Sequence, residues 1–254
     1  MLKSLQFKKI KSFAVFFGSY GEKNLDNYDM LILEAAGYNP DQIGIYKSKG
    51  KIMVAYQSIF EAHSGQSYYQ NFNENSDFIM NNSRRMKNEE YGTYYLDVSK
   101  ERVQNIIFDA ASKHFENGFD GIFLDTLDGL EYLEIEAEYR EKLFLGVAQL
   151  IKRIKKEFPD KIIIQNNGFV AAIDYSYEYI DAICFENPPL KNLGSFIWTL
   201  SVLEKLKKLM IEDGIFSFVL QEENKDFSPF KSIIMKIMLA RYNFLYYKAP
   251  RYYK

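Results

Sequence analysis

The segment that most constrains the fold is GFDGIFLDTLDG, residues 118–129. Its first glycine, Gly118, is typical of a helix end, because glycine readily takes the left-handed conformation found there. An apolar run, Ile122 to Leu124, follows, and two carboxylates, Asp125 and Asp128, stand where this run ends. A buried run between a helix and a loop is typical of parallel strands in α/β proteins. Functional residues of such sheets lie beyond the carboxyl ends of the strands, so Asp125 is the first candidate.

The rest of the chain repeats this alternation of strand and helix. The predicted strands are residues 13–17, 29–34, 52–57, 121–125, 161–165, 182–185, 216–220 and 244–247. The predicted helices are one capped by Asn39, one capped by Ser99, residues 136–158, residues 195–213 and one from Ser228, with residues 77–87 a further candidate. Eight strands separated mostly by helices predict a (β/α)8 TIM barrel with irregular first and last units. The alternative, a doubly wound open sheet, requires a stronger glycine-rich turn than residues 18–21 provide.

Composition limits the classes of partner and location. The 254 residues are 47% apolar and contain no linker-like or repeated segment, so we expect a single domain over residues 1–254. The formal net charge of −2 argues against nucleic acid and membrane surfaces as partners, and it says nothing about oligomeric state. Residues 1–21 show no export signal and no membrane span, which predicts a cytoplasmic protein, or an extracellular or periplasmic one if the chain is a shortened form.

Carboxylate and amide side chains gather where the predicted strands end. They are Glu34, Glu61, Asp125, Asp128, Asn166, Asn167, Glu186, Gln221, Glu222 and Glu223. In a barrel these ends surround one opening, which should therefore be acidic. Loops are commonly polar for solubility alone, and this interpretation suits Glu222 and Glu223 better than it suits Asp125 and Glu186.

Asp125 and Glu186 are the candidate catalytic pair. They end the fourth and sixth strands, and alternate strands of a barrel direct side chains into the same layer. Each follows an apolar run, which should partly desolvate the two carboxyls and separate their pKa values, as an acid and a nucleophile or base require. The alternative is a pair of capped or salt-bridged strand ends.

Other chemistries find less support in the sequence. Two histidines, His63 and His114, have no zinc-like spacing, so we predict no metal and no cofactor, although a Mg²⁺ or Ca²⁺ site made of carboxylates stays open. The single cysteine, Cys184, lies in an apolar run and is interpreted as a small buried residue. The chain has no GxSxG motif, which argues against a serine nucleophile.

The run FDGIFLDTLD, preceded by YLDV and by a helix ending in NGFD, resembles the signature of glycoside hydrolase family 114, the endo-α-1,4-polygalactosaminidases. Residues 52–62 resemble the third strand of that family, with Tyr56, Ser58 and Glu61 at matching positions. Asn166 matches an asparagine after the fifth strand. The resemblance extends from about Ile52 to the sixth strand, and it implies a (β/α)8 barrel.

The resemblance also implies residue roles. Asp125 matches the aspartate of the signature and Glu186 the glutamate after the sixth strand, which are the catalytic pair of the family. By analogy with retaining barrels, Asp125 would attack the anomeric carbon, while Glu186 protonates the leaving oxygen and then activates water. Departures from the family pattern are Glu34, where an aspartate is expected, Phe60 in place of a glycine, and the ending of the seventh strand.

These observations together predict an endo-acting hydrolase of α-1,4-linked, partly de-acetylated galactosamine polysaccharide. The predicted substrate-binding residues are Glu34, Tyr56, Glu61, Asp128, Asn166 and Gln221. An acidic opening independently favours a cationic amino sugar as the partner. Two alternatives remain: a non-catalytic barrel that binds polysaccharide, and an α-galactosidase-like exo-enzyme with a closed pocket that releases monosaccharide.

Overall fold

Eight parallel strands follow one another in the sheet in the same order as in the chain, β1-β2-β3-β9-β10-β11-β12-β13. The structure is a computed structural model that describes residue 7 and residues 9–170, 172–223 and 229–254. It divides into two compact units, Met1–Ala55 with Asp181–Lys254, called unit 1, and Tyr56–Ile180, called unit 2. A single domain over residues 1–254 stays a prediction.

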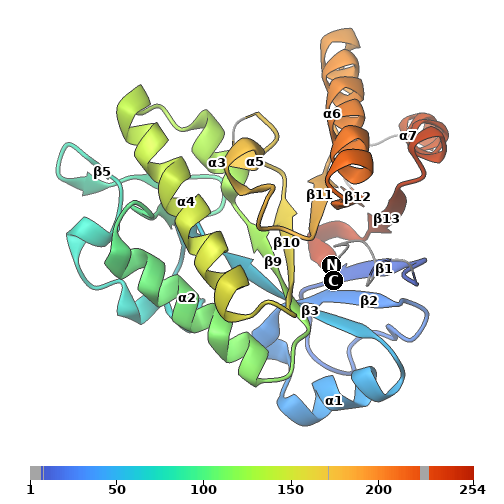
Figure 1. The fold of residues 1–254 in the computed structure, drawn as a ribbon, viewed down its shortest axis with the longest axis horizontal. Coiled ribbons are helices and arrows are strands. Elements are labelled where there is room, and N and C mark those ends of the chain that lie inside the picture. Colours follow the sequence, from blue (N-terminus) through green and yellow to red (C-terminus); the bar gives the residue numbers. More distant parts are fainter. Residues whose placement is uncertain (1–6, 8, 171, 224–228) are drawn as a thin grey trace. The chain divides into compact units, whose positions relative to one another are not determined.

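Unit 1 contains two groups of three parallel strands. They are β1 (Phe13–Phe16), β2 (Met30–Leu33) and the first half of β3 (Ile52–Ser58), then β11 (Ala182–Glu186), β12 (Phe216–Glu222) and β13 (Leu245–Ala249). Its helices are α1 (Pro40–Ser48), α6 (Leu193–Glu212) and α7 (Pro229–Tyr242), with short 3-10 helices at Ala35–Gly37 (η2) and Arg251–Tyr253 (η5) (Figure 1). The ring of Phe13 packs against those of Phe218 and Tyr247, at 4.6 and 5.6 Å between centroids, so β1 also contacts the second group.

Short polar side chains cap the first turns of two helices in unit 1. The side chain of Asn39 accepts a hydrogen bond from the backbone of Gln42 in a capping box, which confirms the predicted start of α1. The start predicted for the next helix at Ser195 is wrong by two residues, because Asn192 caps α6 by the same pattern. Ser228 lies outside the described residues. Within the described residues no α-helix joins β1 to β2, in agreement with an irregular first unit.

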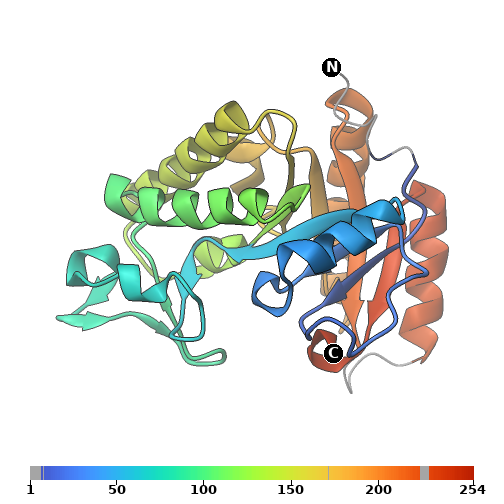
Figure 2. The ribbon, with the colours of Figure 1, turned by 90° about the horizontal axis from the view of Figure 1, so that it is seen from below.

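Unit 2 is built on the parallel pair β9 (Gly121–Asp125) and β10 (Ile162–Asn166). Its helices are α2 (Glu101–Glu116), α3 (Leu127–Tyr132), α4 (Ala137–Glu157) and α5 (Ala172–Ser176). Helices α2 and α4 run side by side (Figure 1, Figure 2). The predicted apolar face of α2 is buried and consists of Val103, Ile106, Ile107 and Ala110. A Cβ on Gly121 would lie 2.5 Å from the carbonyl oxygen of Ile162, so the close approach of β9 and β10 requires glycine at this position.

Between β3 and α2 the chain makes an excursion of short antiparallel strands, drawn in blue-green in Figure 2. They are β4 (Glu61–Ala62), β5 (Met80–Asn81), β6 (Arg84–Arg85), β7 (Lys87–Asn88) and β8 (Thr93–Tyr95), with 3-10 helices at Tyr69–Asn71 and Asn75–Asp77. The helix considered at residues 77–87 is therefore wrong. Asn82 and Ser83 form a two-residue hairpin turn with φ of 47° and 66°, a conformation that asparagine tolerates and that ends a helix.

The predicted cap of α2 is also wrong. Lys100 occupies the N-cap position without a side-chain hydrogen bond. The hydroxyl of Ser99 instead donates to the carboxylate of Asp97 at 2.5 Å, which stabilises the turn before the helix. Among the described helices, none is both long enough and apolar enough to span a membrane.

Candidate functional site

Three of the predicted site residues meet at the end of β9 in unit 2. The hydroxyl of Tyr56 donates to Oδ2 of Asp125 at 2.7 Å, and the side-chain amide of Asn166 donates to Oδ1 at 2.8 Å. Tyr56, Asp125 and Asn166 come from β3, β9 and β10. Because each carboxylate oxygen receives its own donor, the plane of the Asp125 carboxylate is fixed. A carboxylate held in one orientation is suited to attack a carbon atom from a defined direction.

The strands that carry candidate residues end in the same sharp way. In three of them a residue with left-handed backbone directly follows the candidate side chain. These residues are Thr126 (φ 74°) after Asp125, Asn167 (φ 53°) after Asn166, and Asn187 (φ 50°) after Glu186. Asparagine tolerates this conformation better than most residues, whereas for a β-branched threonine it is unusual and costly. The chain turns away at once, which leaves each candidate side chain at the end of its strand.

The unusual backbone of Thr126 is held by its own hydroxyl. This oxygen accepts a hydrogen bond from the backbone N–H of Phe60 at 3.0 Å and lies 3.0 Å from the hydroxyl of Ser58. The backbone N–H of Ile59 donates to the carbonyl oxygen of Asp125 at 3.2 Å. Residues 58–60 thus form hydrogen bonds to both residues of the Asp125–Thr126 peptide, directly after β9. Backbone conformations of high energy that are stabilised by their surroundings are frequent at functional sites. Sequence reasoning missed Thr126.

Glu61 and Asp128 complete an acidic cluster with Asp125 in unit 2. Glu61 is 5% exposed and accepts hydrogen bonds from the hydroxyl of Thr93 at 2.5 Å and the amide of Asn88 at 3.1 Å. Burial raises the pKa of Glu61, these hydrogen bonds oppose the rise, and the charge of Asp125 adds to it. Because its donors come from β7 and β8, Glu61 also connects the short antiparallel strands to the candidate site. Its contact with substrate stays a prediction.

Asp128 lies in the first turn of α3. Burial, followed by the charges of Asp125 and Glu61, raises its pKa to about 6. The N–H of Gly129 opposes this rise by donating to Oδ1 at 3.1 Å. A Cβ on Gly129 would lie 3.1 Å from the Glu61 carboxylate, so α3 and Glu61 approach closely here. At neutral pH the cluster therefore holds more negative charge than it does at pH 5.

In unit 1, Glu186 ends β11 and is bound by two donors at the same oxygen. The hydroxyl of Tyr253, from η5, donates to Oε1 of Glu186, and the amide of Asn187 donates to this oxygen at 3.3 Å. Asn187 is in turn fixed, because its Oδ1 accepts from the backbone of Glu222 at 2.8 Å and from the amide of Gln221 at 3.0 Å. Sequence reasoning missed Tyr253, since the terminal RYYK follows the last predicted strand and has no local pattern.

The remaining predicted residues have less defined surroundings. Gln221 is 2% exposed and supports Asn187, so its direct contact with substrate stays a prediction. Glu34 follows β2 and caps η2 by accepting a hydrogen bond from the backbone N–H of Ala36 at 3.4 Å. Its contact with substrate also stays a prediction.

Burial lowers the pKa of His114 to about 4, and its Nε2 lies 3.0 Å from Oε1 of Gln57, in agreement with a packing role. In the described part of the chain, no three His, Cys, Asp or Glu side chains form a group that could hold a metal ion.

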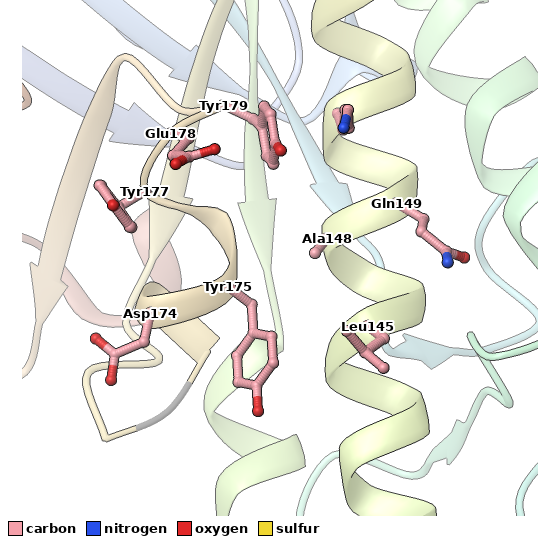
Figure 3. Close-up of a pocket in the computed structure, with 9 residues that line it drawn as sticks. Leu145, Ala148, Gln149, Asp174, Tyr175, Tyr177, Glu178 and Tyr179 are labelled. Carbon is pink, nitrogen blue, oxygen red and sulfur yellow. The ribbon is translucent and has the colours of Figure 1, made fainter.

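A separate hollow of about 410 Å³ lies between α4 and the segment from α5 to β11 (Figure 3). It is lined by Leu145, Ala148, Gln149, Lys152, Asp174, Tyr175, Tyr177, Glu178 and Tyr179. None of the predicted site residues belongs to it. Its rings are engaged within unit 2: Tyr175 stacks on Phe144 at 5.3 Å and donates to Glu141 at 2.5 Å, and the ammonium of Lys152 lies 5.4 Å from the Tyr179 ring. The strand ends are therefore the stronger candidate.

Known proteins resemble this chain in sequence and in structure. The sequence model of Glycoside-hydrolase family GH114 matches residues 3–188. The structure is similar to the glycoside hydrolase domain of PelA from Pseudomonas aeruginosa, with a TM-score of 0.77, 16% identity and 96% of each chain covered. It is also similar to Ega3 of Aspergillus fumigatus, solved in complex with galactosamine, with a TM-score of 0.69, 13% identity and coverage of 96% of this chain and 92% of Ega3.

These likenesses confirm the predicted (β/α)8 TIM barrel. A curated relative, an uncharacterized protein of Thermotoga maritima, is 25% identical over 143 residues, which are 53% of this chain and 43% of the relative. The chain thus spans less than half the length of that curated relative.

Proposed function

Because this chain belongs to glycoside hydrolase family 114, we propose that it hydrolyses α-1,4-linked, partly de-acetylated galactosamine polymers from within the chain. The observation that carries the proposal is the orientation of Asp125 by Tyr56 and Asn166 at the end of β9. These are three of the residues on which the resemblance to the family rests. The galactosamine bound to Ega3 supports this substrate class.

The proposed mechanism uses Asp125 and Glu186 in two steps. First, an oxygen of Asp125 forms a bond to the anomeric carbon while the bond to the glycosidic oxygen breaks, and the proton of Glu186 moves to that oxygen. Next, water attacks the same carbon and releases Asp125, while the Glu186 carboxylate takes a proton from the water. Two inversions at one carbon retain the anomeric configuration. The donors on each carboxylate, from within its own unit, support these separate roles.

The acidic cluster supports a cationic substrate. Glu61, Asp125 and Asp128 place three carboxyls in one region of unit 2, and two of them have raised pKa values partly because of this mutual repulsion. An ammonium group of a de-acetylated sugar would relieve that repulsion. No cofactor is required, because the two carboxyls supply both the nucleophile and the proton.

A digestion of galactosamine oligomers of defined acetylation tests the proposal. We expect intermediate-length products at early times, and products that first appear as the α anomer in NMR spectra. Monosaccharide as the sole early product would indicate the exo-acting alternative. Binding without any cleavage would indicate a non-catalytic polysaccharide-binding barrel.

A further inference from the structure

We infer that Tyr253, in the chain's last turn η5, is a positioning residue for Glu186. The inference rests on the proposed function for the role of Glu186. The observation behind the inference does not depend on the proposed function. The Tyr253 hydroxyl donates to Oε1 of Glu186, a residue 67 positions earlier in the sequence. Tyr253 would therefore act through the proposed acid, Glu186.

The hydrogen bond from Tyr253 determines which carboxyl oxygen of Glu186 carries the proton. Tyr253 and Asn187 both donate to Oε1. A proton on Oε1 would face the hydrogens of these two donors, so protonated Glu186 carries its proton on Oε2 and keeps Oε1 as the acceptor. The O–H on Oε2 is then the group that donates to the glycosidic oxygen, and the same Oε2 takes the proton from water in the second step. Tyr253 thereby selects the oxygen that exchanges protons.

Tyr253 is suited to remain a donor throughout. Burial, followed by the negative charge of Glu186, raises the pKa of the Tyr253 hydroxyl far above its ordinary value, so this group keeps its proton wherever the enzyme is folded. The charges of Glu222 and Cys184 also raise the pKa of this phenol. The Tyr253 hydroxyl therefore remains a hydrogen-bond donor while Glu186 gains and loses its proton.

The last turn is fixed from several sides in unit 1. The carbonyl oxygen of Tyr253 accepts from the backbone N–H of Phe17 at 2.8 Å, and the two rings pack at 5.1 Å between centroids. The backbone N–H of Tyr252 donates to the carboxylate of Glu222 at 2.6 Å. Both Tyr252 and Tyr253 have left-handed backbone, with φ of 58° and 55°. Costly conformations at two successive tyrosines persist only where the surroundings hold them, and here they direct the Tyr253 hydroxyl to Glu186.

Replacement of Tyr253 by phenylalanine tests the inference, with Tyr252→Phe as the matched control. Tyr252 is the neighbouring tyrosine and is 64% exposed, so its variant makes the same chemical change away from Glu186. The rate constant kcat/KM is measured on two substrates: a de-acetylated galactosamine oligomer, whose leaving alkoxide must be protonated, and a nitrophenyl glycoside of that oligomer, whose leaving phenolate need not be. General acid catalysis contributes about 10²- to 10⁴-fold, so we expect Tyr253→Phe to lose about tenfold or more on the oligomer and less than about threefold on the nitrophenyl glycoside.

An equal loss on both substrates, or no loss on the oligomer, would overturn the inference, because a merely structural residue does not discriminate between leaving groups. Tyr252→Phe should match the unmodified protein on both. If the unmodified protein cleaves neither substrate, the proposed function fails, and the positioning role is then decided by crystal structures of the protein and of Tyr253→Phe. A Glu186 side chain that keeps its position in the variant would contradict positioning by Tyr253; a displaced Glu186 would support it.

Discussion

The hydroxyl of Tyr56 donates a 2.7 Å hydrogen bond to Oδ2 of Asp125, from β3 to the end of β9 within unit 2. Together with Asn166 on Oδ1, it leaves the Asp125 carboxylate one orientation. A hydroxyl bound to a carboxylate stabilises its charge as well as its position, so the two effects must be separated by experiment.

Tyr56→Phe should lower kcat/KM on the oligomer by about tenfold, since a hydrogen bond to a charged group is worth about 1.5 to 3 kcal/mol. The loss should be similar on a nitrophenyl glycoside, because the nucleophile acts on both substrates. Tyr91→Phe is the control, at a tyrosine that is 72% exposed. An unchanged rate in Tyr56→Phe would show that Asn166 alone suffices to orient Asp125.

Asp128 should make stability depend on pH. Its pKa is about 6 in the folded protein against 3.8 for the reference group, so between these values the folded state binds more protons than the unfolded state. The stability contributed by Asp128 is therefore present below about pH 4 and lost as pH rises through 6. Relative to the unmodified protein, Asp128→Asn should gain up to about 2 kcal/mol between pH 4 and pH 7. Urea unfolding at four pH values measures this difference, and a constant difference would contradict it.

Thr126→Val should destabilise the protein by about 1 to 3 kcal/mol, because it keeps the shape but leaves the backbone N–H of Phe60 without its acceptor. Thr126→Ser keeps the hydroxyl and should stay close to the unmodified protein. Thermal unfolding of both variants measures the effect. Equal melting temperatures for the Thr126→Ser and Thr126→Val variants would show that the hydroxyl does not stabilise the left-handed backbone of residue 126.

The charge of the substrate should control the rate. De-acetylated oligomers should be cleaved faster than acetylated ones, and this preference should fade as salt shortens the Debye length from about 10 Å at 0.1 M to about 3 Å at 1 M. Polygalacturonate should not be cleaved, because its carboxylates meet the acidic cluster with the same sign of charge. Initial rates at low and high salt measure the preference. A ratio independent of salt would assign specificity to neutral contacts such as those of Tyr56 and Asn166.

The strand ends could be predicted from the sequence, because parallel strands buried on both faces appear as unbroken apolar runs that stop at a polar residue. Asp125 and Glu186 were found in this way. Tyr56 is one of several aromatic residues near predicted strand ends, and the family resemblance singled it out from the others. The excursion at residues 61–95 was not predicted, because strands of two or three residues have no periodicity to detect. Tyr253 reaches Glu186 over a long separation in sequence, and such contacts depend on the completed fold.

The central claim is that Asp125 is the nucleophile and Glu186 the acid and base. The most direct test is the mass of Glu186→Gln after reaction with the nitrophenyl glycoside, whose leaving group needs no acid, while breakdown of the intermediate lacks its base. We predict that the protein gains the mass of one glycosyl group, located on the peptide that contains Asp125, and that Asp125→Asn gains none. An adduct on another residue, or the absence of an adduct together with products of inverted configuration, would contradict the account.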